Sequence, residues 1–118
     1  MKLLDLDARF IRRIPDEGMQ MVDALAEADG VMFQCPKCAE GCEKGEEDGR
    51  RFVRGAHYVI CWFRGRVSDN VSPRGRWTPA GSGLGDLTFV SGNPAQAYSV
   101  LITGGCNWHG YVKDGDAA

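Results

Sequence analysis

Two short motifs in distant parts of the chain carry residues that can bind a metal ion. The first is Cys35-Pro36-Lys37-Cys38, which follows an apolar run, and the second is Cys106-Asn107-Trp108-His109. Zinc prefers thiolate and imidazole ligands in fours, and a spacing of two residues on a tight turn points both side chains at one centre. The motifs together predict one zinc ion with three thiolates and one imidazole as ligands: Cys35, Cys38, Cys106 and His109.

Three further residues are alternative ligands: His57, Cys42 and Cys61. His57 is the main rival for the nitrogen position, although it could equally satisfy a backbone carbonyl at the start of a strand. Cys42 lies among glycines and acids, where a free exposed thiol is the simpler interpretation. Cys61, in Val-Ile-Cys-Trp-Phe, is typical of a buried cysteine. On one strand His57 and Cys61 would lie about 13 Å apart, too far to share an ion.

Catalytic chemistry is the alternative to a structural metal. A catalytic zinc would need three protein ligands, an open position and a nearby general base, for which Asp86 or Glu40 could serve. A cysteine nucleophile with a histidine base has no local family signature in this sequence. A redox Cys-x-x-C usually opens a helix, which the glycine- and acid-rich residues after Cys38 do not predict.

The chain that positions these residues has 118 residues, enough for one domain with a single core. Sixteen glycines predict frequent turns and little long helix. No export signal is evident at the N-terminus, and no apolar run approaches the ~18 residues that span a membrane. We therefore expect a soluble, cytoplasmic protein, in which five cysteines are more often ligands or buried side chains than disulfides.

The apolar pattern predicts an α+β fold that is mainly β, a small antiparallel sheet with one N-terminal helix and zinc-knuckle turns. Residues 1–30 would hold a short strand near Phe10 and an amphipathic helix over residues 16–28, which follows Pro15 and ends at Asp29-Gly30. Residues 31–115 would form the zinc-stapled β domain. Its expected parts are a strand at 31–34, an exposed loop at 39–49, a central strand at 52–63, a strand at 87–90 and a hairpin of 98–103 with 108–113.

Charge is segregated although the net charge is only −2. Residues 50–76 contain seven arginines and one acid, and residues 40–48 contain five acids and one lysine. Two solvated surfaces that partly neutralise each other are the simpler interpretation. The alternative is a nucleic-acid surface, with guanidinium groups on phosphates and indoles stacked on bases. Its candidate binding residues are Arg50, Arg51, Arg54, Arg64, Arg66, Trp62 and Trp77.

Several motifs follow one another in a specific order. They are Phe33-Gln34-Cys35-Pro36-Lys37-Cys38, residues 55–63, Gly75-Arg76-Trp77, residues 83–88 and residues 105–115. Over residues 31–115 this order resembles domain-of-unknown-function family 6527, a small family of bacteria and their phages without an established activity. The resemblance implies a metal site and a phage or prophage setting. It also implies that the recurring pattern includes four residues besides the two cysteine turns: His57, Cys61, Trp77 and Asp86.

These observations predict a small zinc-binding domain without enzymatic activity, because four ligands would close the metal site and a closed site contributes folding energy. With the resemblance, we expect a phage or prophage accessory protein that binds a host protein in the cytoplasm of the bacterial host cell. Nucleic-acid binding and zinc-dependent hydrolysis are the alternatives. No membrane partner is expected, and the sequence leaves the oligomeric state open.

Overall fold

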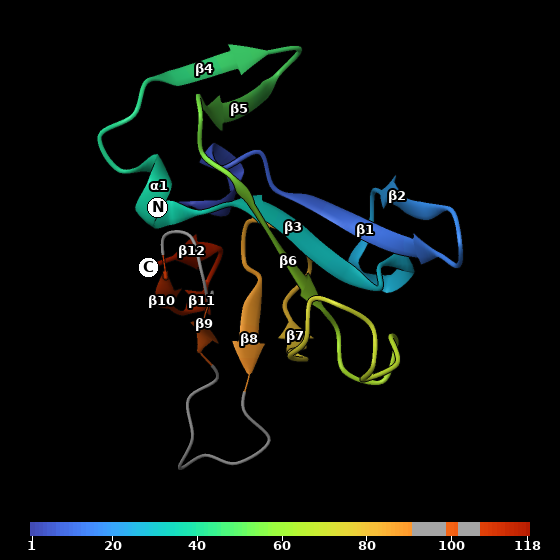
Figure 1. The fold of residues 1–118 in the computed structure, drawn as a ribbon. Helices are drawn as coiled ribbons and strands as arrows, with labels where there is room; N and C mark the ends of the chain where they lie inside the picture. The colour runs from blue at the N-terminus through green and yellow to red at the C-terminus, as the bar shows by residue number, and fades with distance from the viewer. Residues whose placement is uncertain (91–98, 102–106) are drawn as a thin grey trace.

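The structure is a computed structural model that describes residues 1–90, 99–101 and 107–118. In these residues it is mainly β, as the sequence predicts, with one short helix and two 3-10 turns (Figure 1). None of its helices is long and apolar enough to cross a membrane. The elements are η1 (Leu3–Asp5), β1 (Arg9–Ile14), β2 (Gly18–Val22), η2 (Leu25–Glu27), β3 (Gly30–Gln34), α1 (Pro36–Ala39), β4 (Lys44–Glu47), β5 (Arg50–Val53), β6 (Tyr58–Trp62), β7 (Thr78–Ala80), β8 (Thr88–Val90), β9 (Val100–Leu101), β10 (His109–Gly110), β11 (Val112–Lys113) and β12 (Asp116–Ala117).

Four strands form the central sheet in the order β2-β1-β3-β6, and every neighbouring pair is antiparallel. Because alternate side chains of a strand point to opposite faces, each strand serves both faces of the sheet. One face packs into the larger core, which includes Phe33 and Val59. The other face carries a smaller cluster that includes Ile11 and Trp62. This arrangement explains why β6 is apolar on both sides.

Short hairpins surround this sheet. The β4–β5 hairpin lies at one end of the molecule, and β7 to β12 gather at the other side of β3 and β6 (Figure 1). The two ends of the chain meet: the amino group of Met1 donates to the carbonyl of Ala117 at 2.8 Å, and Lys2 forms an isolated bridge with Asp116. The predicted terminal hairpin is present only in part: Leu101 pairs with His109 and Val100 with Gly110. Val112 and Lys113, which were predicted to continue it, pair with β12 instead. The short strands predicted near Phe10 and over residues 31–34 are also present.

The helix predicted over residues 16–28 is wrong. Strand β2 and the 3-10 turn η2 occupy that stretch instead. Asp16 and Gly18 have φ angles of 66° and 110°, which a right-handed helix does not contain. The backbone of β2 pairs with β1 along all five residues, from Gly18↔Ile14 to Val22↔Phe10. Pairing with a neighbouring strand therefore outweighed a helical spacing of apolar residues.

The strand predicted over residues 52–63 is divided into β5 and β6, with Gly55 at φ 83° in the break. Its predicted central position is also wrong, because β6 is an edge of the four-stranded sheet in the part of the chain that the structure describes. Directly after β6, Phe63 forms an isolated bridge with Trp77. The break is needed because β5 belongs to a separate hairpin.

The loop predicted over residues 39–49 contains strand β4, which is largely exposed. The turn from β4 to β5 is Asp48-Gly49, with φ angles of 52° and 77°. Two successive positive φ angles are typical of a type I′ hairpin turn, which favours Asp-Gly. Glu46 lies opposite Arg51 and Glu47 opposite Arg50, so the acidic and basic segments do neutralise each other in part, across one hairpin.

Candidate metal centre

The Cys-x-x-C motif forms a turn at the end of β3. Cys35 is the N-cap of α1, and Pro36 occupies the first helical turn, where proline is favoured. The amide of Ala39 donates to the carbonyl of Cys35 at 2.9 Å and closes this single turn. Cys35 is completely buried and Cys38 is half-buried. Since α1 ends at Ala39, the motif lacks the longer helix that the redox interpretation requires.

The register of the sheet brings His57 to this turn. Gln34 of β3 lies opposite Tyr58 of β6, and the same antiparallel register carried one step further sets Cys35 opposite His57. The amide of Cys35 donates to the carbonyl of His57 at 2.8 Å. The backbones of two segments that are distant in the sequence are therefore joined at the point where their side chains could share an ion.

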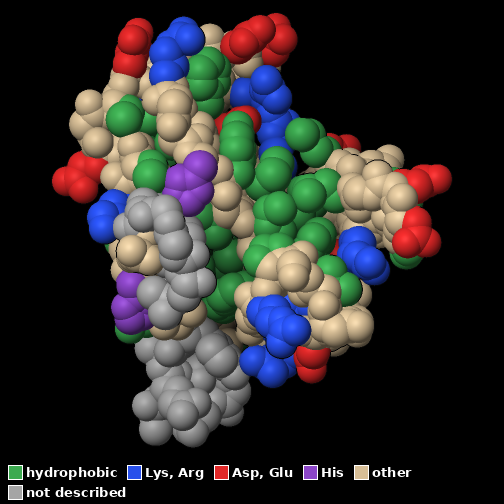
Figure 2. All heavy atoms as spheres, in the orientation of Figure 1, with side chains coloured by type: hydrophobic (Ala, Val, Ile, Leu, Met, Phe, Trp, Pro, Cys, Tyr) green, Lys and Arg blue, Asp and Glu red, His purple; other side chains and the backbone are tan. Residues whose placement is uncertain are grey.

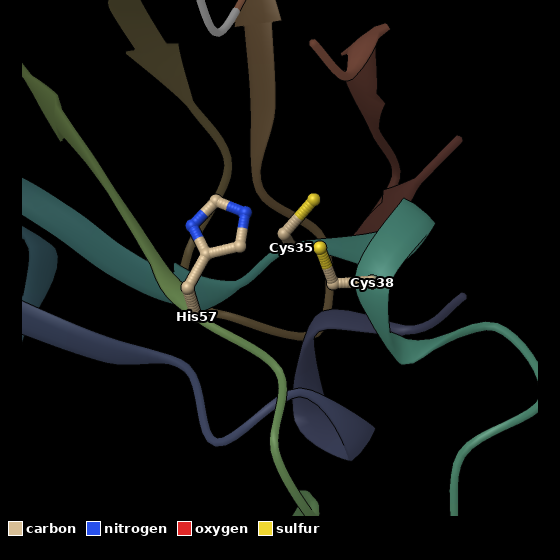
Figure 3. A group of neighbouring side chains, drawn as sticks. All are labelled: Cys35, Cys38 and His57. Carbon is tan, nitrogen blue, oxygen red and sulfur yellow. The ribbon is translucent and has the colours of Figure 1, made fainter. Parts of the chain in front are cut away.

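The thiols of Cys35 and Cys38 and the imidazole of His57 form one cluster. Their ligand atoms all lie within 4.8 Å of one another. The two sulfur atoms and the imidazole ring face a common space (Figure 3). Around a tetrahedral zinc with bonds of about 2.0 to 2.3 Å, such atoms would be separated by about 3.4 to 3.8 Å, so a small contraction would suffice. The donor set and its spacing are compatible with a metal ion.

A buried amide holds the two segments in place. Gln34 is 4% exposed, and its Oε1 accepts from the amide of Val53 at 2.8 Å while its Nε2 donates to the carbonyl of Val53 at 2.6 Å. The same Nε2 lies 3.3 Å from the carbonyl of Ala56. Gln34 directly precedes Cys35, and Ala56 directly precedes His57, so this side chain orients both halves of the cluster. Sequence analysis missed it; the signal was a polar residue inside an apolar strand beside the motif.

No described residue of the second motif belongs to this cluster. Cys106 lies outside the described residues. His109, on β10, is exposed and is not one of the three clustered residues, and its ring centroid lies 6.3 Å from that of Tyr111. Among the described residues, the nitrogen donor beside the Cys-x-x-C turn is therefore His57, the alternative that the sequence left open.

The other two cysteines that the structure describes lie outside this cluster. Cys61, on β6, is completely buried in the larger core, as its apolar neighbours predict, and burial raises the pKa of its thiol. Cys42 is exposed, as expected for its position, and its thiol donates to the carbonyl of Cys38 at 3.0 Å. Cys42 is thus close to the turn without belonging to the three-residue group.

Asp86 forms a turn of its own. Its carboxylate accepts from the amides of Ser82 and Gly83 and from the hydroxyl of Ser82, all at 2.9 to 3.0 Å. These hydrogen bonds, those to Gly83 and Ser82 first, lower the pKa of Asp86. The carboxylate of Asp86 therefore stabilises its own turn, and both of its oxygens already accept hydrogen bonds there.

The two tryptophans predicted to stack on bases are buried. Trp62 is 3% and Trp77 is 8% exposed, and their indole nitrogens donate to the carbonyls of Ser72 and Ser99, each at 3.1 Å. Both rings pack within the protein, so little of either ring is exposed for stacking on a base. Their apolar surface serves the two cores instead.

The arginines of the basic block are divided between two places. Arg50, Arg51 and Arg54 lie on or beside the β4–β5 hairpin, where Arg51 pairs with Asp5 at 3.1 Å and Arg54 lies 3.8 Å from Glu43. Arg64 and Arg66 follow β6 and donate to backbone carbonyls. The block is therefore not one continuous basic surface.

Comparison with known proteins gives no relative. No family model matches the chain. No curated protein and no solved structure matches it either. The resemblance to family 6527 stays a prediction, and the functional argument depends on the site itself.

Proposed function

We propose that this chain is a small zinc-stapled binding module in which Cys35, Cys38 and His57 hold a structural zinc ion. The observation that carries the proposal is the meeting of three ligand atoms within 4.8 Å of one another, contributed by two separate segments. Two sulfurs and an imidazole nitrogen favour zinc, whereas magnesium and calcium prefer oxygen ligands.

The position of the cluster favours a structural role. The ion would tie the turn after β3 to the start of β6, next to a core in which Cys35 is fully buried. A domain of this size has a modest core, and metal binding can supply part of its folding free energy. Cys106 and His109 stay the predicted candidates for the fourth ligand. A zinc-dependent hydrolase is the hypothesis to adopt if water is found in that position.

The function we expect of the stapled domain is binding to another protein, a host protein if the chain is encoded by a phage. A nucleic-acid partner has less support, because Trp62 and Trp77 are buried and the arginines are divided between two places. Short exposed strands such as β2 and β4 offer surfaces for protein contacts.

The test is the metal content of the purified full chain by mass spectrometry, followed by unfolding with and without a chelator. We expect about one zinc per chain in the wild type and in the matched control Cys42→Ser. Cys38→Ser and His57→Ala should lose the metal. Zinc should stabilise the wild type by about 3 to 4 kcal/mol when its free concentration exceeds Kd by roughly 100- to 1,000-fold.

Cobalt substitution then reports the coordination number, because four-coordinate cobalt absorbs visible light more strongly than five- or six-coordinate cobalt. A Cys106→Ser variant that loses this intense absorption would identify the fourth ligand. A wild-type chain that is fully folded and contains no zinc after growth in zinc-supplemented medium would refute the proposal. So would a His57→Ala variant with unchanged zinc content.

A further inference from the structure

Strand β2 forms an open edge of the central sheet. It pairs with β1 along its whole length, and in the described part of the chain no other strand adjoins it. The backbone hydrogen bonds outside the regular strand pairs include none from residues 18–22. Alternate amides and carbonyls along its outer side therefore have no described partner, which is a ready template for another strand.

This edge lacks the usual protection against pairing. Its sequence, Gly18-Met19-Gln20-Met21-Val22, has no charge and no proline, and its register with β1 has no bulge. Met19 and Met21 are 43% and 56% exposed and lie two residues apart, hence on the same face. The β1–β2 hairpin extends away from the β4–β5 hairpin and from the C-terminal strands (Figure 1). An added strand could reach this edge from the side.

Both ends of the edge are acidic. Asp16 and Glu17 precede β2 and Asp23 follows it, and all three are exposed. None of them is in an ion pair among the residues that the structure describes. Figure 2 shows acidic side chains over this end of the molecule. A partner strand would therefore gain from cations at both of its ends.

The same charges disfavour a second copy of this chain as the partner. Antiparallel self-pairing centred on Gln20 would set Gly18 opposite the other copy's Val22, and one step further out Glu17 opposite the other copy's Asp23. Like charges directly opposite each other destabilise a strand pair. A partner segment with lysine or arginine opposite Glu17 and Asp23 would be attracted to β2, whereas a second copy of this chain would be repelled.

We propose that the β2 edge binds an extended segment of a partner protein, with about five β-forming residues flanked on both sides by lysine or arginine. The outer amides and carbonyls of β2 would bind its backbone, and Met19 and Met21 would contact its alternate side chains. Asp16, Glu17 and Asp23 would select for its basic ends. This inference names the surface and partner class of the proposed binding module, and it does not depend on the metal.

The experiment selects peptides from a random twelve-residue library on the immobilised full chain and measures the best peptide by fluorescence anisotropy. We expect enrichment of short runs rich in Val, Ile, Thr and Tyr between Lys or Arg residues. Met21→Lys should weaken binding at least about tenfold, whereas the matched control Leu4→Lys, at a similarly exposed apolar residue elsewhere, should bind like wild type. The triple variant Asp16→Asn, Glu17→Gln, Asp23→Asn should weaken binding about tenfold and flatten its salt dependence.

A change in the peptide tests the strand geometry without touching the protein. Methylation of the backbone nitrogens along one edge of the peptide should abolish binding, and methylation along the other edge should not. Equal binding of the two methylated peptides, unchanged binding to Met21→Lys, or no enriched peptide would overturn the proposal. So would a wild-type dimer in sedimentation experiments that Met21→Lys dissociates, because a second copy would then occupy the edge.

Zinc content measured on the same preparation separates the two proposals. Peptide binding by a folded, zinc-free chain would refute the zinc staple and support the β2 edge. A chain with about one zinc and no peptide binding would support the zinc staple and refute the β2 proposal.

Discussion

Replacing Gln34 by leucine removes the amide that joins β3 to the chain before β6. Leucine keeps most of the side-chain volume but makes none of the hydrogen bonds to the backbone of Val53 and Ala56. Val53 is 1% exposed, so its amide and carbonyl would lose these partners in a place that water does not reach readily. Each buried polar group left unpaired costs about 1 to 3 kcal/mol. With two short bonds and one long one lost, we expect a decrease of about 2 to 5 kcal/mol in the free energy of unfolding.

The assay is urea unfolding of the chain in chelator, which removes any contribution from metal. Gln20→Leu is the matched control, because Gln20 also makes a side-chain hydrogen bond, to Arg12 at 2.8 Å, but on the exposed strand β2. We expect the control to change stability by about 0.5 kcal/mol or less. If Gln34→Leu changes the free energy of unfolding as little as the control does, Gln34 does not hold the two segments together and the reasoning fails.

The same variant tests the effect of Gln34 on the cluster. Releasing the segment before His57 should lower zinc affinity by about 10- to 100-fold, as losses of groups that orient metal ligands do. Affinity is measured by competition with a chelator in the absence of urea, where the variant is still folded. An unchanged zinc affinity in a destabilised variant would restrict Gln34 to a purely structural role.

Three further predictions concern other contacts. Arg76→Ala should lower stability by about 3 to 5 kcal/mol in urea unfolding, because the buried guanidinium donates to five backbone carbonyls of its own loop, and an Arg76→Lys variant that is no less stable than wild type would contradict this. Partial burial and then the hydrogen bond to Asp7 raise the pKa of Tyr58 to about 12, so the stability it contributes should be present below pH ~10 and lost as pH rises toward ~12. Tyr58→Phe should lack that alkaline loss in pH-dependent melting. In a thiol-labelling time course on the folded chain, Cys42 should react first and Cys61 only on unfolding, and early labelling of Cys61 would contradict its burial.

Much of the strand pattern is local. The alternation around Phe10 and over residues 31–34 predicts β1 and β3, because side chains on a strand must serve two faces with a period of two. The Asp-Gly pairs at 48–49 and 114–115 also favour turns through their own residue types, since both residues of each pair adopt positive φ. Asp48-Gly49 by itself indicates the β4–β5 hairpin.

The stretch over residues 16–28 could not be decided locally. Its apolar residues fit a helix by spacing, but the backbone of β2 could also bind β1, and the turn at Asp16 to Gly18 adopts the left-handed conformations that a hairpin needs. Which option prevails depends on the presence of a paired neighbour strand.

By itself, the sequence determined the chemistry of the candidate site: two thiols on one turn, because a spacing of two residues brings Cys35 and Cys38 together wherever that turn lies. Only the tertiary structure decided which residue could be the third ligand. His57 meets them because β3 and β6 pair antiparallel with Gln34 opposite Tyr58, which joins the end of one strand to the start of the other. Register between distant strands is set by the whole core and by clamps such as Gln34, and no local pattern contains it.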